Sequence, residues 1–241
     1  MRILVFQHLA AEHPGTFRDV WAQDGHTWDI VDFEAGAAIP APDLYDLLIV
    51  MGGTMNVWQE DEHPFLAPEK AAIRHWVKDL GRPYFGVCLG HQLLAEALGG
   101  RVGLMPKPEI GLAAVRLTED GRSDPLFSGF PDRTDVFQWH GAEVQELPTG
   151  AHILAGNHAS SVQAMRWGRH ACGVQFHPEI SESSIADWER IPAYKADLEK
   201  ALGKEKADGL AGLVRPRLPE FRTAAERFSR NVLEDAADGP F

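Results

Sequence analysis

Cysteine is scarce in this sequence, and long apolar runs are missing altogether. The 241 residues include only two cysteines, Cys88 and Cys172, and neither belongs to a Cys-x-x-Cys pair. Two isolated cysteines cannot form the disulfide framework of a small secreted domain. The apolar run at residues 3–6 is shorter than the roughly 7–15 residues of a signal peptide, and no run reaches the ~18 residues of a membrane span. We therefore expect a protein of the reducing cytoplasm with no membrane segment.

Positive charge is also in short supply. Lys and Arg total 23 against 35 Asp and Glu, which gives a formal net charge of −12 at pH 7. Nucleic acids and anionic membrane surfaces bind clustered positive charge, and no basic run offsets this balance. Neither a nucleic acid nor a membrane is therefore expected as a partner.

The common cofactor motifs are absent as well. The chain has no Gly-x-Gly-x-x-Gly segment and no P-loop, so neither a dinucleotide nor a P-loop nucleotide site is indicated. Its 11 histidines do not form a His-Glu-x-x-His motif, and no EF-hand spacing occurs. We expect no catalytic metal and no cofactor.

The sequence has the composition of an ordinary globular protein, and predicted strands alternate with predicted helices along it. Hydrophobic residues make up 44% of the chain and charged residues 24%. Apolar runs predict buried strands at residues 3–6, 28–33, 47–51 and 84–87. Amphipathic stretches over residues 66–80 and 94–98 predict the intervening helices. This alternation predicts an α/β fold with a doubly wound, mostly parallel sheet.

The second half of the chain has a different pattern of predicted elements. Further strands with short turns between them are predicted at residues 113–118, 135–139, 153–155, 161–166 and 171–176, as an antiparallel extension or a second sheet. Near the C-terminus a stripe spaced 3, 4, 3 and 4 apart predicts a helix with one packed face: Leu218, Phe221, Ala225, Phe228 and Val232. We predict a main domain over residues 1–190, with residues 191–241 as a helical tail docked on it rather than an independent domain.

Residues 86–90, Gly-Val-Cys-Leu-Gly, match the pattern of a nucleophile turn with Cys88 in the place of serine. They follow a predicted strand and open a predicted helix. Such a turn is too tight for side chains at the flanking glycines. The helix N-terminus favours a thiolate, and the N–H of Leu89 is placed to bind an oxyanion. A buried cysteine beside packing glycines is the competing interpretation.

A thiolate nucleophile needs a base and a group that orients it. His177 comes just after the last predicted strand, where open α/β sheets place functional groups, and Glu179 is close enough to bond its far ring nitrogen. A strand-end histidine satisfied by a local carboxylate would also fit this segment. Together with the nucleophile turn, however, the pattern indicates a Cys88–His177–Glu179 triad.

At this point the sequence resembles the class I glutamine amidotransferases, a Cys-His-Glu family with a flavodoxin-like core. The resemblance covers roughly residues 1–180 and is strongest to the stand-alone branch of the family, which resembles the amidotransferase half of GMP synthase. Four segments carry it: residues 50–53 (Val-Met-Gly-Gly), 86–95, 137–141 (Phe-Gln-Trp-His-Gly) and 173–179 (Gly-Val-Gln-Phe-His-Pro-Glu).

The resemblance implies a role for each matching residue. Cys88 would attack the γ-amide carbon, His177 would transfer the proton and Glu179 would hold His177. The N–H groups of Gly53 and Leu89 would form the oxyanion hole. Contacts to the substrate are expected from four further residues: Gly52, Gln92, Trp139 and His140. The chain departs from the family at Thr54, where a proline usually follows the two glycines, and a looser turn there would affect the Gly53 donor.

The implied activity is hydrolysis of the γ-amide of glutamine or a related γ-glutamyl compound through a cysteine thioester. No synthase motif is found in the roughly 60 residues after Glu179. A stand-alone hydrolase is therefore slightly favoured over a glutaminase subunit that delivers ammonia to a separate synthase. A non-catalytic binding or regulatory module is the alternative of another class, although the complete triad opposes it. Peptidase relatives of the same fold usually have His directly after the nucleophile, where this chain has Leu89.

Overall fold

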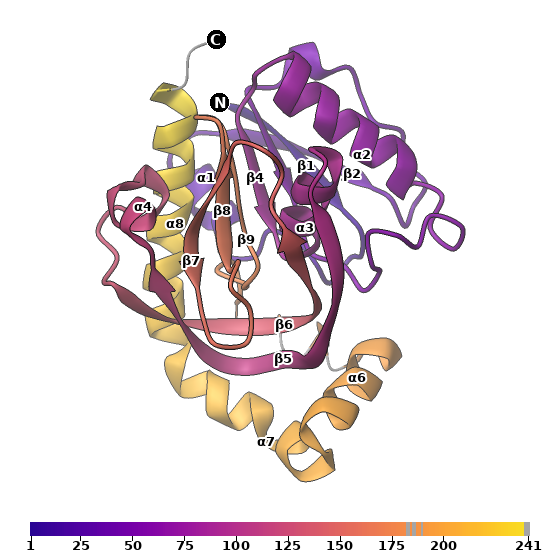
Figure 1. Cartoon of the computed structure of the whole chain (residues 1–241), viewed down its shortest axis with the longest axis vertical. Coiled ribbons are helices and arrows are strands. Elements are labelled where there is room, and N and C mark those ends of the chain that lie inside the picture. Colours follow the sequence, from indigo (N-terminus) through magenta and orange to yellow (C-terminus); the bar gives the residue numbers. More distant parts are fainter. Residues whose placement is uncertain (182–183, 185–186, 189, 239–241) are drawn as a thin grey trace.

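A computed structural model of the chain describes residues 1–181, 184, 187–188 and 190–238. Within these residues nine strands form one mixed sheet in the order β2-β1-β3-β4-β9-β8-β7-β5-β6 (Figure 1). The strands are β1 (Arg2–Gln7), β2 (Thr27–Asp32), β3 (Leu47–Val50), β4 (Tyr84–Val87), β5 (Arg101–Leu117), β6 (Arg133–Glu146), β7 (Ala151–Gly156), β8 (Ala164–Trp167) and β9 (Ala171–Val174).

The parallel part of the sheet consists of β2, β1, β3, β4 and β9. Strands β1, β3, β4 and β9 are buried on both faces because both faces are covered. The buried strand predicted at residues 28–33 was wrong in its burial, since β2 lies at the edge of the sheet and most of its residues are at least partly exposed. In β1, Ile3 and Val5 belong to one core cluster, whereas Leu4 and Phe6 belong to the cluster on the opposite face. This part of the sheet brings the carboxyl ends of β1, β3, β4 and β9 to one edge, where open α/β sheets bind ligands.

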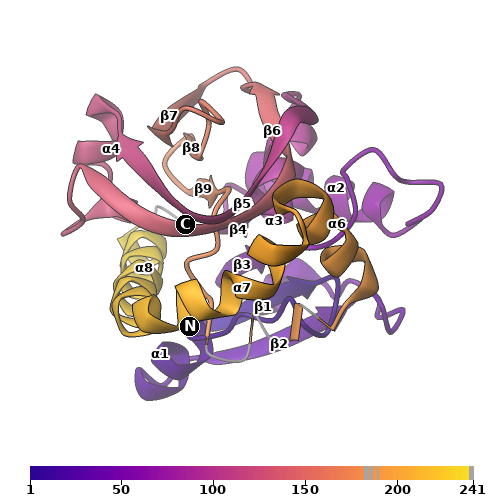
Figure 2. The same cartoon turned by 90° about the horizontal axis from the view of Figure 1, so that it is seen from below.

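Helices cover each face of the parallel part. Helices α2 (Leu66–Arg74) and α3 (Leu89–Ala97) pack on one face, and α1 (Phe17–Gln23) packs with the C-terminal helix on the other (Figures 1 and 2). A π-helical segment, His75–Asp79, extends α2, and the short helix α4 (Glu119–Ser123) follows β5. Single 3-10 turns occur at Pro42–Leu44, Pro125–Phe127 and Arg215–Arg217.

The antiparallel part is dominated by one long ribbon of two strands. β5 has 17 residues and β6 has 14, and their pairing shifts register between Leu104 and Glu109. Pro106 and Pro108 lie within this shift, because proline has no N–H to give to the ladder. The ribbon therefore bulges, and the bulge forms part of a pocket wall described below.

Helices α6 (Pro192–Leu202), α7 (Lys204–Val214) and α8 (Leu218–Asp238) lie after the last strand of the sheet. Figure 1 shows α8 running along one side of the molecule, with α6 and α7 next to the β5–β6 ribbon. Phe228 on α8 is buried, and its ring lies 4.4 Å from that of Phe130 and 5.7 Å from that of Phe176. Arg166 of β8 also pairs with Asp235 of α8 at 2.9 Å. The helical tail thus contributes to the same core as the sheet.

Comparison with the sequence confirms the α/β class, the mostly parallel sheet with its antiparallel extension, and the helical tail. The predicted packed stripe is also confirmed, since Phe221, Ala225, Phe228 and Val232 are buried. The division at residue 190 into a domain and a dependent tail stays a prediction. Residues 239–241 of that tail lie outside the described residues.

Some predicted element lengths were wrong. The strands predicted at 113–118 and 135–139 correspond to the C-terminal end of the much longer β5 and to the first half of β6, because glycines and prolines interrupt the alternation of apolar residues in the rest of the ribbon. Residues 66–80 were predicted as one regular helix, but α2 changes to the π-helical segment after Arg74. None of the helices in the described part of the chain is long and apolar enough to span a bilayer.

Candidate active site

Cys88 lies at the sharp turn between β4 and α3, at the sheet edge defined above. Its backbone has φ 51° and ψ −103°, and among the described residues it is the one non-glycine with positive φ. A Cβ at Gly86 would collide with the backbone of Gly90, and one at Gly90 with the carbonyl of Val50. The two glycines are therefore required by the turn. A backbone strained in this way is common at functional sites.

The histidine and the glutamate expected beside it are brought together after β9. His177 Nδ1 lies 2.8 Å from Glu179 Oε1, and both side chains are buried. Because an ionised carboxylate can only accept, Nδ1 donates this hydrogen bond and Nε2 is left for Cys88, with which His177 also interacts. The ring of Trp188 packs edge-on against the imidazole at 4.8 Å and fixes its orientation.

Electrostatics favour a charged His177. Burial opposes the charge, but the negative charges of Glu179 and Cys88 and the hydrogen bonds to both outweigh burial, so the pKa of His177 is raised well above its usual value. An imidazolium facing a thiol at a helix N-terminus stabilises the thiolate. The arrangement therefore has the electrostatics of an activated cysteine nucleophile.

Cys88 opens onto a pocket of about 520 Å³. Predicted site residues that line it are Gly53, Cys88, Leu89, Gln92, Trp139 and His140. The opposite wall is the bulge of the β5–β6 ribbon, residues 104–108, and Lys200 and Ala201 of α6 form part of the rim. The proposed nucleophile and both proposed oxyanion donors line the pocket. His177 and Glu179 are not among its lining residues.

The residues expected to contact substrate have different surroundings. Gln92 uses its amide nitrogen to donate to Ala142 O and Gln175 Oε1, both at 3.0 Å. The carbonyl oxygen of Trp139 lies 3.8 Å from Cys88 Sγ. His140 is held by Ala142 O at 2.9 Å and Glu109 at 3.2 Å.

Gly52 has a different position from the other predicted contacts. A Cβ built on it would meet Glu12 and lie 3.2 Å from His177 Cε1, so Gly52 faces the triad histidine and not the pocket wall. Its lack of a side chain makes room for the buried Glu12 and for His177.

Several residues near the nucleophile had no recognised role in the sequence. Gln175 donates from Nε2 to Cys88 Sγ at 3.6 Å. Its only sequence signal was membership of the segment that ends in His177 and Glu179. Glu12, in the loop after β1, and Lys200, in the tail, come from segments without any motif, and only the fold brings them to the site.

One cluster of side chains in the described part of the chain has the spacing of a metal site. The candidate ligand atoms of Glu12, His177 and Glu179 lie within 4.8 Å of one another. His177 Nδ1 is already engaged by Glu179 at 2.8 Å, and its other nitrogen faces the Cys88 side. The same atoms thus serve the triad, and a single imidazole held between carboxylate and thiol is the donor set of an acid–base catalyst.

A second pocket, of about 580 Å³, lies between β7, β8 and α8. Its buried cation, Arg166, is already neutralised by Asp124 at 2.6 Å and Asp235 at 2.9 Å. Its lining residues include no cysteine, and its one histidine, His152, faces Asp120 at 3.7 Å in an exposed pair. The pocket at Cys88 is therefore the candidate active site.

His91 and Cys172 are buried and lie near the nucleophile turn, but neither has the electrostatics of a catalyst. Burial raises the pKa of the Cys172 thiol to about 12, although Arg166 acts in the opposite direction. Burial also lowers the pKa of His91 to about 4. At neutral pH Cys172 is therefore a thiol and His91 is uncharged.

The low pKa of His91 predicts a specific acid sensitivity. In the unfolded protein this histidine takes up a proton near pH 6.5, whereas in the folded protein it does so only near pH 4. The free energy of unfolding therefore falls as the pH drops between these values. Between pH 7 and 4.5, the free energy of unfolding of the His91→Leu variant should fall by about 2.5 kcal/mol less than that of the wild type, as measured by urea unfolding. The exposed His152→Leu change is the control. Equal losses in wild type and His91→Leu would contradict the assignment.

Comparisons with known proteins agree with this geometry. The family model described as glutamine amidotransferase class-I matches residues 22–186. A putative glutamine amidotransferase-like protein, YfeJ, from Salmonella typhimurium is 31% identical over 191 residues, covering 77% of this chain and 78% of that protein. The crystal structure of a glutamine amidotransferase from Thermotoga maritima superposes with a TM-score of 0.83 at 30% identity, covering 96% of this chain and 98% of that one.

GMP synthases are also similar to this chain. One subunit of the glutamine-hydrolysing GMP synthase from Sulfolobus acidocaldarius is 36% identical over 140 residues, which cover 58% of this chain and 70% of that subunit. The GMP synthase of Thermomicrobium roseum is 37% identical, but the match covers only 24% of its length. With its nucleophile turn, its histidine–glutamate pair and a family match over most of its length, the chain belongs to the class I glutamine amidotransferase family.

Proposed function

We propose that this protein hydrolyses the γ-amide of glutamine, or of a related γ-glutamyl compound, through a thioester on Cys88. The observation that carries the proposal is the strained Cys88 at the N-terminus of α3, facing the buried His177–Glu179 pair at the floor of a pocket. The free state of both cysteines is consistent with action in the cytoplasm.

The reaction begins with attack of the Cys88 thiolate on the amide carbon. The carbonyl oxygen becomes an oxyanion, which the N–H groups of Gly53 and Leu89 bind. The His177 imidazolium then donates its proton to the leaving nitrogen, the carbon–nitrogen bond breaks, and ammonia or an amine departs from the glutamyl thioester. His177 next takes a proton from water, whose oxygen attacks the thioester carbon. Glutamate leaves, and the thiolate of Cys88 and the imidazolium of His177 are restored.

Substrate binding is assigned to the pocket wall. Gln92 has both hydrogen bonds on its amide nitrogen, so its Oε1 is the atom available to accept from the ammonium group of the glutamyl moiety. The backbone of Trp139 and the fixed ring of His140 close the pocket beside Cys88. Gly52 contributes space for His177 and supports the adjoining Gly53 donor.

Two candidates differ in whether the reaction involves a partner protein. The rim residues Lys200 and Ala201 come from the chain's own tail, which supports a stand-alone hydrolase. The similarity to a separate subunit of a glutamine-hydrolysing GMP synthase supports the second candidate, a glutaminase that delivers ammonia to a separate synthase.

An assay of glutamate release by the purified chain alone distinguishes these candidates. A stand-alone hydrolase releases glutamate from glutamine or γ-glutamyl amines without any added protein, whereas a glutaminase subunit requires its synthase for full turnover. A γ-glutamyl chloromethyl ketone tests the third candidate, a non-catalytic binding module. Alkylation of Cys88, located by peptide mass spectrometry, is expected for an active enzyme. Failure of the reagent to label Cys88, together with no turnover of any γ-glutamyl amide, would reject the enzymatic proposal.

A further inference from the structure

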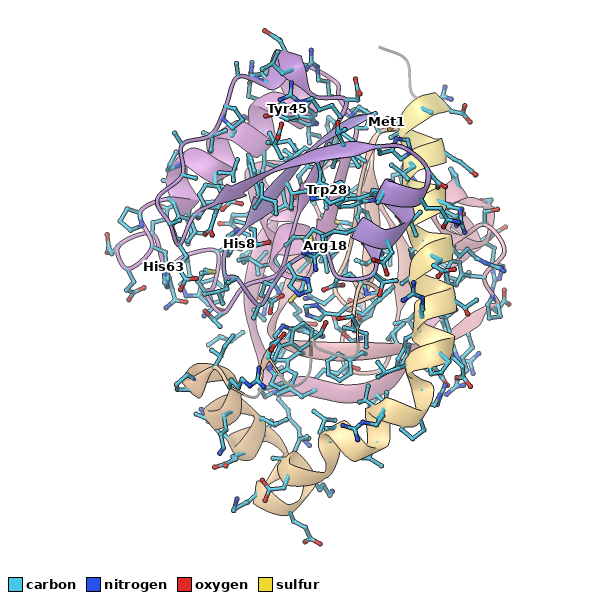
Figure 3. All side chains as sticks on the ribbon, turned by 180° about the vertical axis from the view of Figure 1, so that it is seen from behind. Met1, His8, Arg18, Trp28, Tyr45 and His63 are labelled. Carbon is cyan, nitrogen blue, oxygen red and sulfur yellow. The ribbon has the colours of Figure 1, made fainter. Side chains whose placement is uncertain are left out.

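A fully buried histidine–carboxylate pair lies under the loop that carries the Gly53 donor. His8, in the turn after β1, places Nε2 2.9 Å from Oε1 of Glu69 on α2 and Nδ1 2.8 Å from the carbonyl oxygen of Gly52. Both side chains have no exposed surface. The His8 ring stacks on Phe33 with a centroid distance of 5.6 Å and lies tilted against Phe65 at 6.0 Å. In Figure 3, His8 lies well inside the outline of the molecule.

The hydrogen-bond partners determine the charge of this pair. A backbone carbonyl can only accept, so Nδ1 of His8 carries a proton that it donates to Gly52. The Glu69 carboxylate accepts from Nε2 in the same way, which makes the ring an imidazolium. Burial alone would neutralise it, but Glu69 and the bond to Gly52 keep the pKa of His8 above its usual value. A buried ion pair of this kind rarely improves stability over an apolar pair, so another role is needed to explain it.

The Gly52 carbonyl belongs to the peptide whose N–H is that of Gly53. No peptide bond in the described residues is cis, so the Gly53 N–H points to the side opposite His8. Within the described part of the chain this N–H has no acceptor, and Gly53 lines the pocket with Cys88 and Leu89. Resting on the proposed function, we propose that His8 and Glu69 are positioning residues that hold the Gly52–Gly53 peptide with its N–H turned to the oxyanion.

The local sequence explains why such a clamp is needed here. A peptide between two glycines has no side chain to restrict its rotation. Gly52 cannot carry one because Glu12 and His177 occupy the space, and a Cβ on Gly53 would lie 2.6 Å from Met55 and 2.8 Å from Leu89. The next residue is Thr54, which lacks the fixed φ of a proline. The hydrogen bond from His8 therefore restricts the peptide that the chain itself leaves free to rotate.

Two double variants, one without and one with a donor to Gly52, test the proposal. His8→Phe with Glu69→Leu keeps an aromatic ring and removes both the charge pair and the donor. His8→Asn with Glu69→Leu places an amide nitrogen where Nδ1 was. For glutamine hydrolysis, we expect kcat to fall about 10²-fold in the first variant with KM within about twofold, because the oxyanion forms only in the transition state. The second variant should recover at least about tenfold of that loss.

A matched control replaces an exposed pair of the same chemistry, as His75→Phe with Asp79→Leu, and should leave kcat unchanged. Thermal unfolding establishes that each variant is folded, and iodoacetamide alkylation of Cys88 should proceed at the wild-type rate in all of them. Equal kcat values in the two double variants, with an active wild type, would overturn the positioning role alone. A wild type inactive on glutamine and on every γ-glutamyl amide would overturn the proposed function and this inference with it.

Discussion

Replacing Cys88 by alanine should abolish glutamine hydrolysis, with kcat falling at least about 10⁴-fold. No other thiol can take over, since Cys172 lies in β9 as a buried thiol with its pKa raised by burial. The change should leave the fold intact, because alanine is smaller than cysteine and keeps the Cβ that the turn already accommodates at positive φ. Glutamate release measured on the purified variant, beside thermal unfolding, checks both expectations.

The matched control for this change is Cys172→Ala, which removes the other thiol of the chain. We expect it to keep hydrolysis within a fewfold of the wild type. A Cys88→Ala protein that retained full activity would refute the thioester mechanism, whatever the family similarity.

The second large effect is expected at His177. His177→Ala removes the group that transfers both protons and the positive charge that stabilises the thiolate, so kcat should again fall by about 10⁴-fold. Glu179→Gln should be milder, about 10²–10³-fold, because the amide oxygen still accepts from Nδ1 while the charge that raises the pKa of His177 is lost.

Two readouts separate these roles. The rate of Cys88 alkylation by iodoacetamide at pH 7 reports the thiolate population, and it should fall in both variants. His152→Ala, a change at an exposed residue of β7, should alter neither alkylation nor turnover. Normal alkylation in His177→Ala would show that the thiolate does not depend on the imidazolium.

The candidate triad could be proposed from the sequence because its signals are local. Cys88 sits between two close glycines, and Glu179 is two residues from His177, so each half has a recognisable pattern. The family followed from the same segments and is confirmed by the comparisons. The roles assigned to individual residues remain predictions that the variants above test.

The missed features depend on contacts between distant segments. His8 and Glu69 are 61 positions apart, and Gln175 lies 87 positions from Cys88. No periodicity predicts that a histidine after one strand will meet a glutamate on a helix. The bulge of the β5–β6 ribbon was missed for a related reason, since Pro106 and Pro108 normally argue against a strand and here occur where the register shifts.

The rim formed by α6 has a consequence for how this enzyme can diversify. The family match ends at residue 186, before Lys200 and Ala201. The proposed reacting groups thus lie within the family match, and the α6 residues at the rim of the pocket follow it in the sequence. If the proposed function holds, substitutions in α6 are expected to change which leaving amine fits, and therefore KM, without disturbing the backbone geometry at Cys88.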